Sequence, residues 1–148
     1  MYGRRASFLD AGRDRIRHHL AQKQNHQEVL FVTIEAFYAA VGGDYQATLR
    51  RLMVPEIVET FAVRYAQDTT VDRLHRALEA GDAERAFRTA HSLRGLAQNL
   101  DFLRLYQAAA VLTEALRPRL LPVNPALVAA VDAAHRQVLK AIAAYTKA

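Results

Sequence analysis

The chain has 148 residues, 51% hydrophobic and 24% charged, which is enough for one domain with its own core. Only 6 Gly and 4 Pro accompany abundant Ala and Leu, so the composition favours an all-α protein. The absence of cysteine excludes disulfides, thiol catalysis and cysteine–zinc sites. No run reaches the roughly 18 apolar residues of a transmembrane helix, and none has the pattern of a signal peptide. We therefore expect a cytoplasmic protein that does not enter a membrane.

The formal net charge is +5, and more than half of it lies at the start of the chain. Residues 1–28 contain six Lys or Arg and three Asp or Glu, a net charge of +3. A basic segment can bind nucleic acid, a membrane surface or an acidic partner. No ladder of aromatic residues and no nucleic-acid-binding motif accompanies these charges, so we expect a solvated tail or surface helix rather than a nucleic-acid partner.

Residues 1–53 are predicted to be a basic N-terminal extension that is helical or partly disordered. Its most apolar run, 29–41, ends at Gly42-Gly43, a combination typical of the end of a helix. Pro55 suits the first turn of a helix and disfavours helical geometry at the residue before it. We therefore divide the chain after residue 53 and expect one or two extra helices in the N-terminal part.

Residues 54–148 are predicted to form an antiparallel four-helix bundle with short connections. Apolar residues recur at helical spacing in four segments, about 55–80, 83–100, 101–117 and 125–146. In the second segment, the residues expected to be buried are Ala86, Ala90, Leu93, Ala97 and Leu100. Their spacing of 4, 3, 4 and 3 residues is typical of a bundle seam.

The first of these four helices is predicted to be interrupted. Asp68-Thr69-Thr70 favours a kink or a cap, after which the helix resumes at Val71. Before the kink, one apolar face is expected to hold Ile57, Val58, Phe61, Ala62 and Tyr65.

His91 lies one residue past Ala90, which turns it about 100° away from the expected seam and into solvent. Arg94 and Gly95 follow at positions +3 and +4, so they share its face of the helix. Glycine within a helix costs roughly 0.5–1 kcal/mol relative to alanine. The usual reason for accepting that cost is the close approach of a partner or a ligand, so we expect a contact surface here.

A neutral imidazole is a nucleophile toward phosphorus, and a phosphorylated one carries about −2 charge that guanidinium groups can bind. Arg88 and Gln98 lie on the same helical face as His91 and are further candidates to contact that anion. No glycine-rich nucleotide-binding loop is present, so the pattern indicates a carrier of phosphoryl groups rather than a kinase. His75 and His135 lack the Arg–Gly pattern and are expected at the surface or the core boundary.

Residues 84–116, and more loosely 55–146, resemble a histidine-containing phosphotransfer (HPt) domain. The family signature reads roughly H-x-L-K-G-x-x-x-x-L-G, and the chain has His91, Leu93, Arg94, Gly95 and Leu100 at the matching positions. The resemblance implies a phosphorelay intermediate that carries a phosphoryl group on His91 between the aspartates of receiver domains. The implied partners are response-regulator receiver domains and a hybrid sensor kinase. No cofactor is expected in the chain itself, since the Mg²⁺ for the transfer belongs to the receiver.

The resemblance also assigns roles and shows two departures. Arg94 replaces the usual lysine and is the main expected phosphate ligand, with Arg88 and Gln98 as secondary contacts; Gly95 leaves clearance for the receiver. Asp101 stands where a glycine is usual at the end of the helix, and aspartate tolerates left-handed geometry better than most residues.

Two other functions stay open on the sequence. A helical adaptor could dock a receiver or kinase without any transfer, and a basic helical protein could bind nucleic acid through residues 1–28. The chain could be free-standing or part of a longer hybrid kinase, and its kinase, regulator and oligomeric state are not encoded in any motif.

Overall fold

The computed structural model describes residues 33–146, and every regular element in this range is helical. The elements are α2 (Ile34–Ala40), α3 (Tyr45–Leu52), α4 (Pro55–Arg64), the 3-10 helix η1 (Tyr65–Gln67), α5 (Thr70–Glu79), α6 (Ala83–Leu100), α7 (Leu103–Leu116) and α8 (Pro125–Thr146). The all-α prediction is confirmed for these residues. None of these helices is long and apolar enough to cross a bilayer. Predictions about residues 1–32, including the basic segment 1–28, lie outside the described residues.

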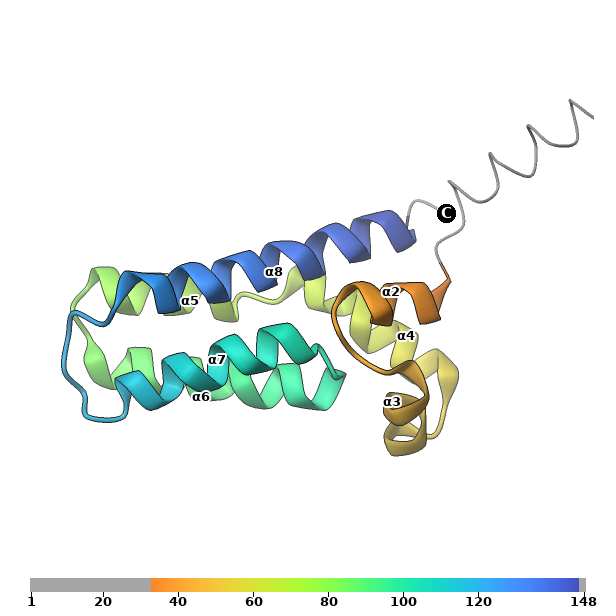
Figure 1. Ribbon diagram of the computed structural model, residues 1–148, viewed down its shortest axis with the longest axis horizontal. Coiled ribbons are helices and arrows are strands. Elements are labelled where there is room, and N and C mark those ends of the chain that lie inside the picture. The colour runs from red at the N-terminus through yellow and green to blue at the C-terminus, as the bar shows by residue number, and fades with distance from the viewer. Residues whose placement is uncertain (1–32, 147–148) are drawn as a thin grey trace, which may run out of the picture.

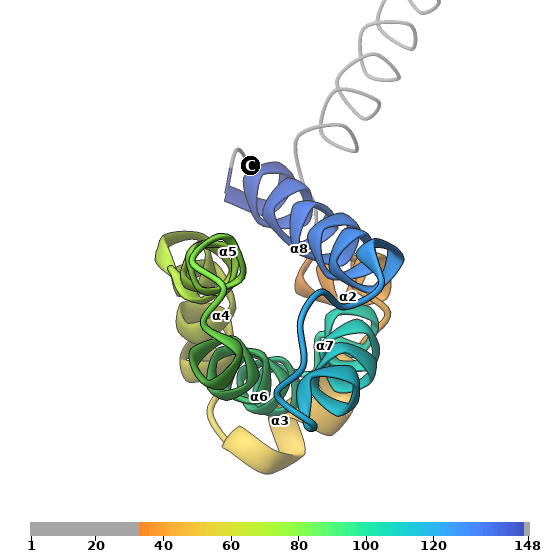
Figure 2. The ribbon, with the colours of Figure 1, turned by 90° about the vertical axis from the view of Figure 1, so that its left-hand side faces the viewer.

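The long helices surround one hydrophobic core. Helix α6 packs against α5 on one side and α7 on the other, and α8 packs against α7 (Figure 1). Figure 2, which looks along the long helices, shows α5, α6, α7 and α8 arranged around the core. The largest fully buried side chains are Tyr38, Phe37, Phe102, Leu74, Leu93, Leu105, Leu112 and Leu116. The core therefore receives side chains from α2 as well as from the long helices.

Helix α6 buries the predicted seam. The five residues expected inside are all buried, between 0% and 5% exposed: Ala86, Ala90, Leu93, Ala97 and Leu100. The Asp82 carboxylate caps the start of the helix by accepting from the Arg85 amide at 3.0 Å. Asp101 ends the helix in the left-handed conformation, with φ 58° and ψ 37°. The predicted span and the predicted left-handed aspartate are both confirmed.

Helix α4 buries only part of its predicted apolar face. Val58, Ala62 and Tyr65 are at most 3% exposed, whereas Ile57 and Phe61 are 40% and 42% exposed. Ile57 and Phe61 precede the buried positions by one residue, so they form the edge of the stripe, about 100° around the helix. The five residues share one side of the helix, as predicted, and the packing of α4 covers the centre of this stripe while leaving its edge exposed.

Sharp breaks separate α4 from its neighbours, as the sequence predicted. Met53 has a left-handed backbone (φ 67°), and Pro55 opens α4. At the other end, the 3-10 helix η1 follows α4, and the Asp68 carboxylate accepts from the Thr70 amide at 2.8 Å to start α5.

Helices α2 and α3 pack on the same core as the later helices. Phe37 and Tyr38 are 1% and 0% exposed, and the Phe37 ring meets Phe102 edge-on at 5.9 Å. The Asp44 amide donates to the Asp101 carboxylate at 2.6 Å, which joins α3 to the end of α6. The division of the chain after residue 53 stays a prediction, but the described part of the extension belongs to the common core.

The contact between the α2–α3 turn and the end of α6 leaves no room for a side chain at Gly43. A Cβ atom built there lies 2.0 Å from the backbone oxygen of Asp101. We predict that Gly43→Ala lowers the free energy of unfolding by about 1–3 kcal/mol, the usual cost of overpacking. Urea unfolding followed by circular dichroism measures it. Gly95→Ala, where an added Cβ meets no described atom within 4 Å, is the matched control; equal stability of the two variants would contradict the packing described here.

Candidate functional site

His91 projects into solvent from the middle of α6, as predicted. Its neighbours Ala90 and Leu93 are both 0% exposed, and because they hold the helix against the core, His91 must face outward. The described part of the chain contains three histidines, and the other two have hydrogen-bond partners. His75 lies 2.6 Å from Asp132, and His135 lies 2.7 Å from the Tyr65 hydroxyl. Among these three, His91 is the one without a hydrogen-bond partner in the described residues.

Gly95 leaves open space one turn after His91. Apart from its own stretch of helix backbone, no described atom lies within 4 Å of a Cβ built at this position. The glycine is therefore not required by packing within the described chain, although it costs helix stability. The position is open within the described residues, and its use as clearance for a partner stays a prediction.

Arg94 is drawn toward α7 by a carboxylate. Its Nη1 atom lies 3.6 Å from Oε1 of Glu114, and its guanidinium lies 5.8 Å from the centroid of the Tyr106 ring. The side chain keeps 33% of its surface exposed. Arg94 thus carries its charge on the same helical face as His91, in a partly exposed ion pair with Glu114.

Arg88 and Gln98, the predicted secondary contacts, lie on the same helix and are both exposed. The Arg88 Nε donates to Glu84 at 2.8 Å, one turn toward the start of α6 and therefore away from His91. The Gln98 backbone oxygen accepts from Arg51 at 3.0 Å. In the described residues, neither side chain is hydrogen-bonded to His91, so their roles toward a phosphoryl group stay predictions.

Sequence reasoning missed an aromatic neighbour of His91. The Phe87 ring stacks on the His91 imidazole, with centroids 6.2 Å apart and planes inclined by 21°. Phe87 lies at position −4, so helical spacing alone could have found it. Arg119, in the segment between α7 and α8, covers the same Phe87 ring at 3.7 Å, and no sequence pattern brings it there.

Two carboxylates and four guanidinium groups surround this part of α6. Hydrogen bonds from Arg119 and from Arg88 lower the pKa of Glu84, and hydrogen bonds from Arg117 lower the pKa of Glu114. Both carboxylates are therefore ionised near neutral pH. With Arg94 included, four positive charges face two negative ones, which leaves a surplus of +2. This local surplus of positive charge favours the binding of an anion.

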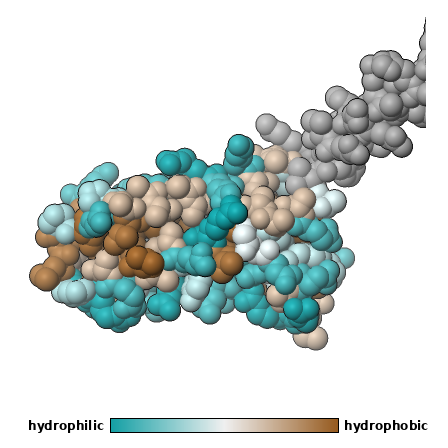
Figure 3. Space-filling view, in the orientation of Figure 1, coloured by the Kyte–Doolittle hydropathy of each residue, from teal (hydrophilic) through white to brown (hydrophobic). Residues whose placement is uncertain are grey.

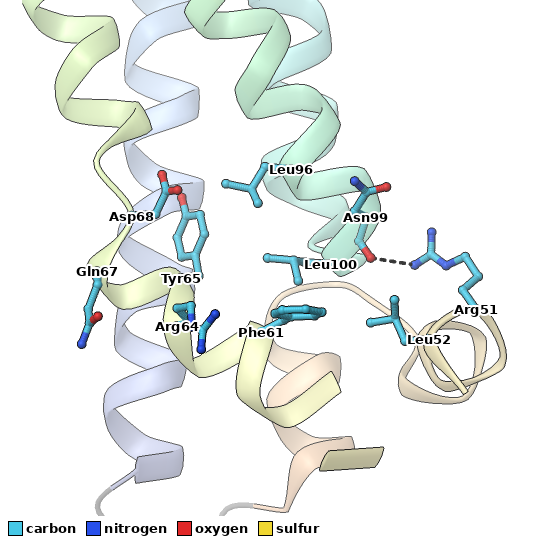
Figure 4. Close-up of a pocket in the computed structure, with 10 residues that line it drawn as sticks. All are labelled: Arg51, Leu52, Phe61, Arg64, Tyr65, Gln67, Asp68, Leu96, Asn99 and Leu100. Carbon is cyan, nitrogen blue, oxygen red and sulfur yellow. Dashed lines mark hydrogen bonds between the residues drawn. The ribbon is translucent and has the colours of Figure 1, made fainter. Parts of the chain in front are cut away.

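An apolar groove opens beside the C-terminal half of α6. It has a volume of about 810 Å³ and lies between α3, α4 with η1, and α6 (Figure 4). The residues that line it are Arg51, Leu52, Phe61, Arg64, Tyr65, Gln67, Asp68, Leu96, Asn99 and Leu100. Leu96 follows His91 by five residues, about 7.5 Å along the helix axis. The groove therefore begins within one and a half turns of the histidine along the axis, but about 140° around the helix from it.

No group of three or more His, Cys, Asp or Glu in the part of the chain that the structure describes could hold a metal ion. The site defined so far is a single exposed imidazole on an all-helical protein, next to surplus positive charge and an open glycine position. A side chain of this kind can accept and return a small anionic group.

Comparison with known proteins identifies the family. The family model described as Hpt domain matches residues 56–144, which include α5, α6 and α7 and nearly all of α4 and α8. The chain belongs to the Hpt domain family. Hpt domains take part in histidine phosphotransfer in two-component signalling; they are phosphocarrier modules rather than kinases, and they interact with receiver domains. No curated protein and no solved structure matches the chain well enough to count as a relative.

The open position at Gly95 gives a test that needs no partner. We predict that Gly95→Ala raises the free energy of unfolding by about 0.5–1 kcal/mol, because alanine is the better helix former and its Cβ meets no described atom within 4 Å. Thermal or urea unfolding measures the change. A loss of stability would mean that another part of the chain occupies this space.

Proposed function

We propose that this protein is a phosphorelay intermediate that carries a phosphoryl group on His91 between the aspartates of two receiver domains. Its α4–α5, α6, α7 and α8 would then serve as the antiparallel four-helix bundle of the carrier. The observation that carries the proposal is that the His91 ring is exposed and has no hydrogen-bond partner among the described residues. Within a region that matches the Hpt model, His91 is the described histidine with an exposed, unpaired ring.

The transfer needs no catalytic base from this chain. A lone pair on a neutral His91 ring nitrogen attacks the phosphorus of the receiver's acyl phosphate, and an N–P bond forms. The bond between phosphorus and the aspartate oxygen breaks, and the carboxylate leaves with the bonding electrons. The second ring nitrogen keeps its proton throughout. In the reverse sense the phosphohistidine delivers the group to the aspartate of a second receiver, and the receiver supplies the Mg²⁺.

The surrounding charges stabilise the phosphorylated state. We assign Arg94 as the main phosphate ligand: its guanidinium exchanges the Glu114 carboxylate, now 3.6 Å away, for phosphoryl oxygens. Arg88 and Gln98 provide secondary contacts, and Arg88 must leave Glu84 to do so. Gly95 provides the clearance through which the receiver's loops reach His91.

In this proposal the receiver also contacts the apolar groove beside the C-terminal half of α6. Leu96 and Phe61 border the groove, and Phe61 and Ile57 stay about two-fifths exposed on α4. Burial of this exposed apolar surface against a partner would favour association. Arg51 and Arg64, which also line the groove, supply positive charge that suits an acidic partner.

The decisive variant is His91→Gln, which keeps a polar side chain but has no nucleophilic nitrogen. Incubation with a phosphorylated receiver should transfer an acid-labile, base-stable label to the unsubstituted chain and none to the variant. His75→Gln, which changes a histidine already held by Asp132, is the control and should accept label normally. Binding of the receiver without any label on the unsubstituted chain would instead identify a docking adaptor.

Arg94 offers a graded test of phosphate stabilisation. We predict that Arg94→Ala slows phosphoryl uptake by His91 about tenfold or more, the effect expected from losing one charge-assisted contact in the transition state. Arg94→Lys should retain most of the rate because it keeps the charge. The rates follow from quenched-flow transfer from a labelled receiver; equal rates for the alanine variant and the unsubstituted chain would exclude this role.

A further inference from the structure

The His91 ring belongs to a stack of side chains that come from two distant segments. The guanidinium carbon of Arg119 lies 3.7 Å from the centroid of the Phe87 ring, and Phe87 in turn stacks on His91 at 6.2 Å. A guanidinium over an aromatic face and two nearly parallel rings are both attractive arrangements. Side-chain contacts therefore link Arg119, in the α7–α8 connection, to His91 through the Phe87 ring.

Arg119 is fixed from its own side of the stack. Its Nε donates to Oε2 of Glu84 at 2.9 Å, and its Nη1 donates to the backbone oxygen of Arg117 at 2.6 Å. Its backbone amide donates to the oxygen of Leu116 at 2.9 Å, in a left-handed conformation with φ 56°. The two side-chain hydrogen bonds therefore fix the plane of the Arg119 guanidinium, and the face of this group covers the Phe87 ring.

We propose that Arg119 and Phe87 are positioning residues that hold the His91 imidazole in one orientation for phosphoryl transfer. This inference rests on the proposed function and adds to it a restraint supplied by the α7–α8 connection. An exposed imidazole on a bare helix turns about its two side-chain bonds. A ring held by its face against Phe87 turns less and keeps its edge, where both nitrogens lie, available to a partner.

Orientation matters because phosphoryl transfer depends mainly on the in-line placement of the attacking atom. Neither Arg119 nor Phe87 supplies an atom to the reaction. Their contribution is therefore expected in the rate of phosphorylation and in the motion of the ring, and not in whether His91 is the acceptor.

The test uses phosphoramidate, a small phosphoryl donor that needs no docking surface. Arg119→Met and Phe87→Leu should each slow phosphorylation of His91 by about threefold to tenfold. Phe87→Tyr keeps an aromatic ring of the same shape, and its rate of phosphorylation should stay close to that of the unsubstituted chain. Arg136→Met, an equal loss of charge at an exposed position on α8, is the control and should change the rate by less than about twofold.

A second readout follows the ring directly. In the unphosphorylated protein, ¹⁵N and ¹³C relaxation of the His91 ring should show greater mobility in Arg119→Met and Phe87→Leu than in the unsubstituted chain. Circular dichroism confirms that the variants fold, and Arg119 lies outside the helices and the core, so its variant should do so.

The outcomes separate this inference from the proposed function. If phosphoramidate does not label the unsubstituted chain at His91, the proposed function fails. If it labels that chain and both stack variants at equal rates with unchanged ring mobility, only the positioning role fails. Equal slowing in Arg136→Met would show a general effect of charge and would also overturn the positioning role.

Discussion

Burial of one stripe of α6 determines the direction in which every other side chain of that helix points. Ala90 and Leu93 are fully buried on either side of His91 in the sequence, so the imidazole faces solvent. A rotation of the helix that brought His91 inward would expose Leu93, at a cost of about 1.5–3 kcal/mol for that side chain alone. It would also bury a polar ring without a partner. The same packing that stabilises the core therefore presents His91, the open glycine position and the arginines on one face.

The charges around this face are arranged so that they can change partners. Glu84 and Glu114 are paired with Arg88, Arg94, Arg117 and Arg119 in exposed contacts. Exposed ion pairs of this kind add little to stability, because water and salt screen them. In the proposed function, a phosphoryl group on His91 would compete for one of these guanidinium groups at little cost in stability. In this view the two carboxylates keep the guanidinium groups in place until the anion arrives.

The sequence predicted most of the fold because its signals are local. The α6 span, its buried seam, the break at Pro55 and the aspartate caps all depend on residues within one or two turns. Helical spacing also placed His91, Arg94 and Gly95 together. The exposure of Ile57 and Phe61 could not be predicted in this way, because it depends on which part of the α4 stripe the neighbouring helices cover.

Two features of the site depend on tertiary structure and have no sequence signal. Arg119 reaches Phe87 only because the chain returns along α7 and brings the following segment beside the start of α6. Glu114 meets Arg94 for the same reason, since α7 lies next to α6. The joining of α3 to the end of α6 through Asp101 also links residues 57 positions apart. Such contacts follow from the packing of the helices and not from the pattern of any one of them.

The central claim is that one imidazole, that of His91, is the acceptor among six histidines. ¹⁵N NMR of histidine-labelled protein before and after treatment with phosphoramidate tests this claim directly, because an N–P bond shifts the ring nitrogen that carries it. The account predicts that the signals of His91 move to those of a phosphoimidazole while those of His75 and His135 keep their positions. Phosphorylation of another histidine in preference to His91, or of none, would contradict it.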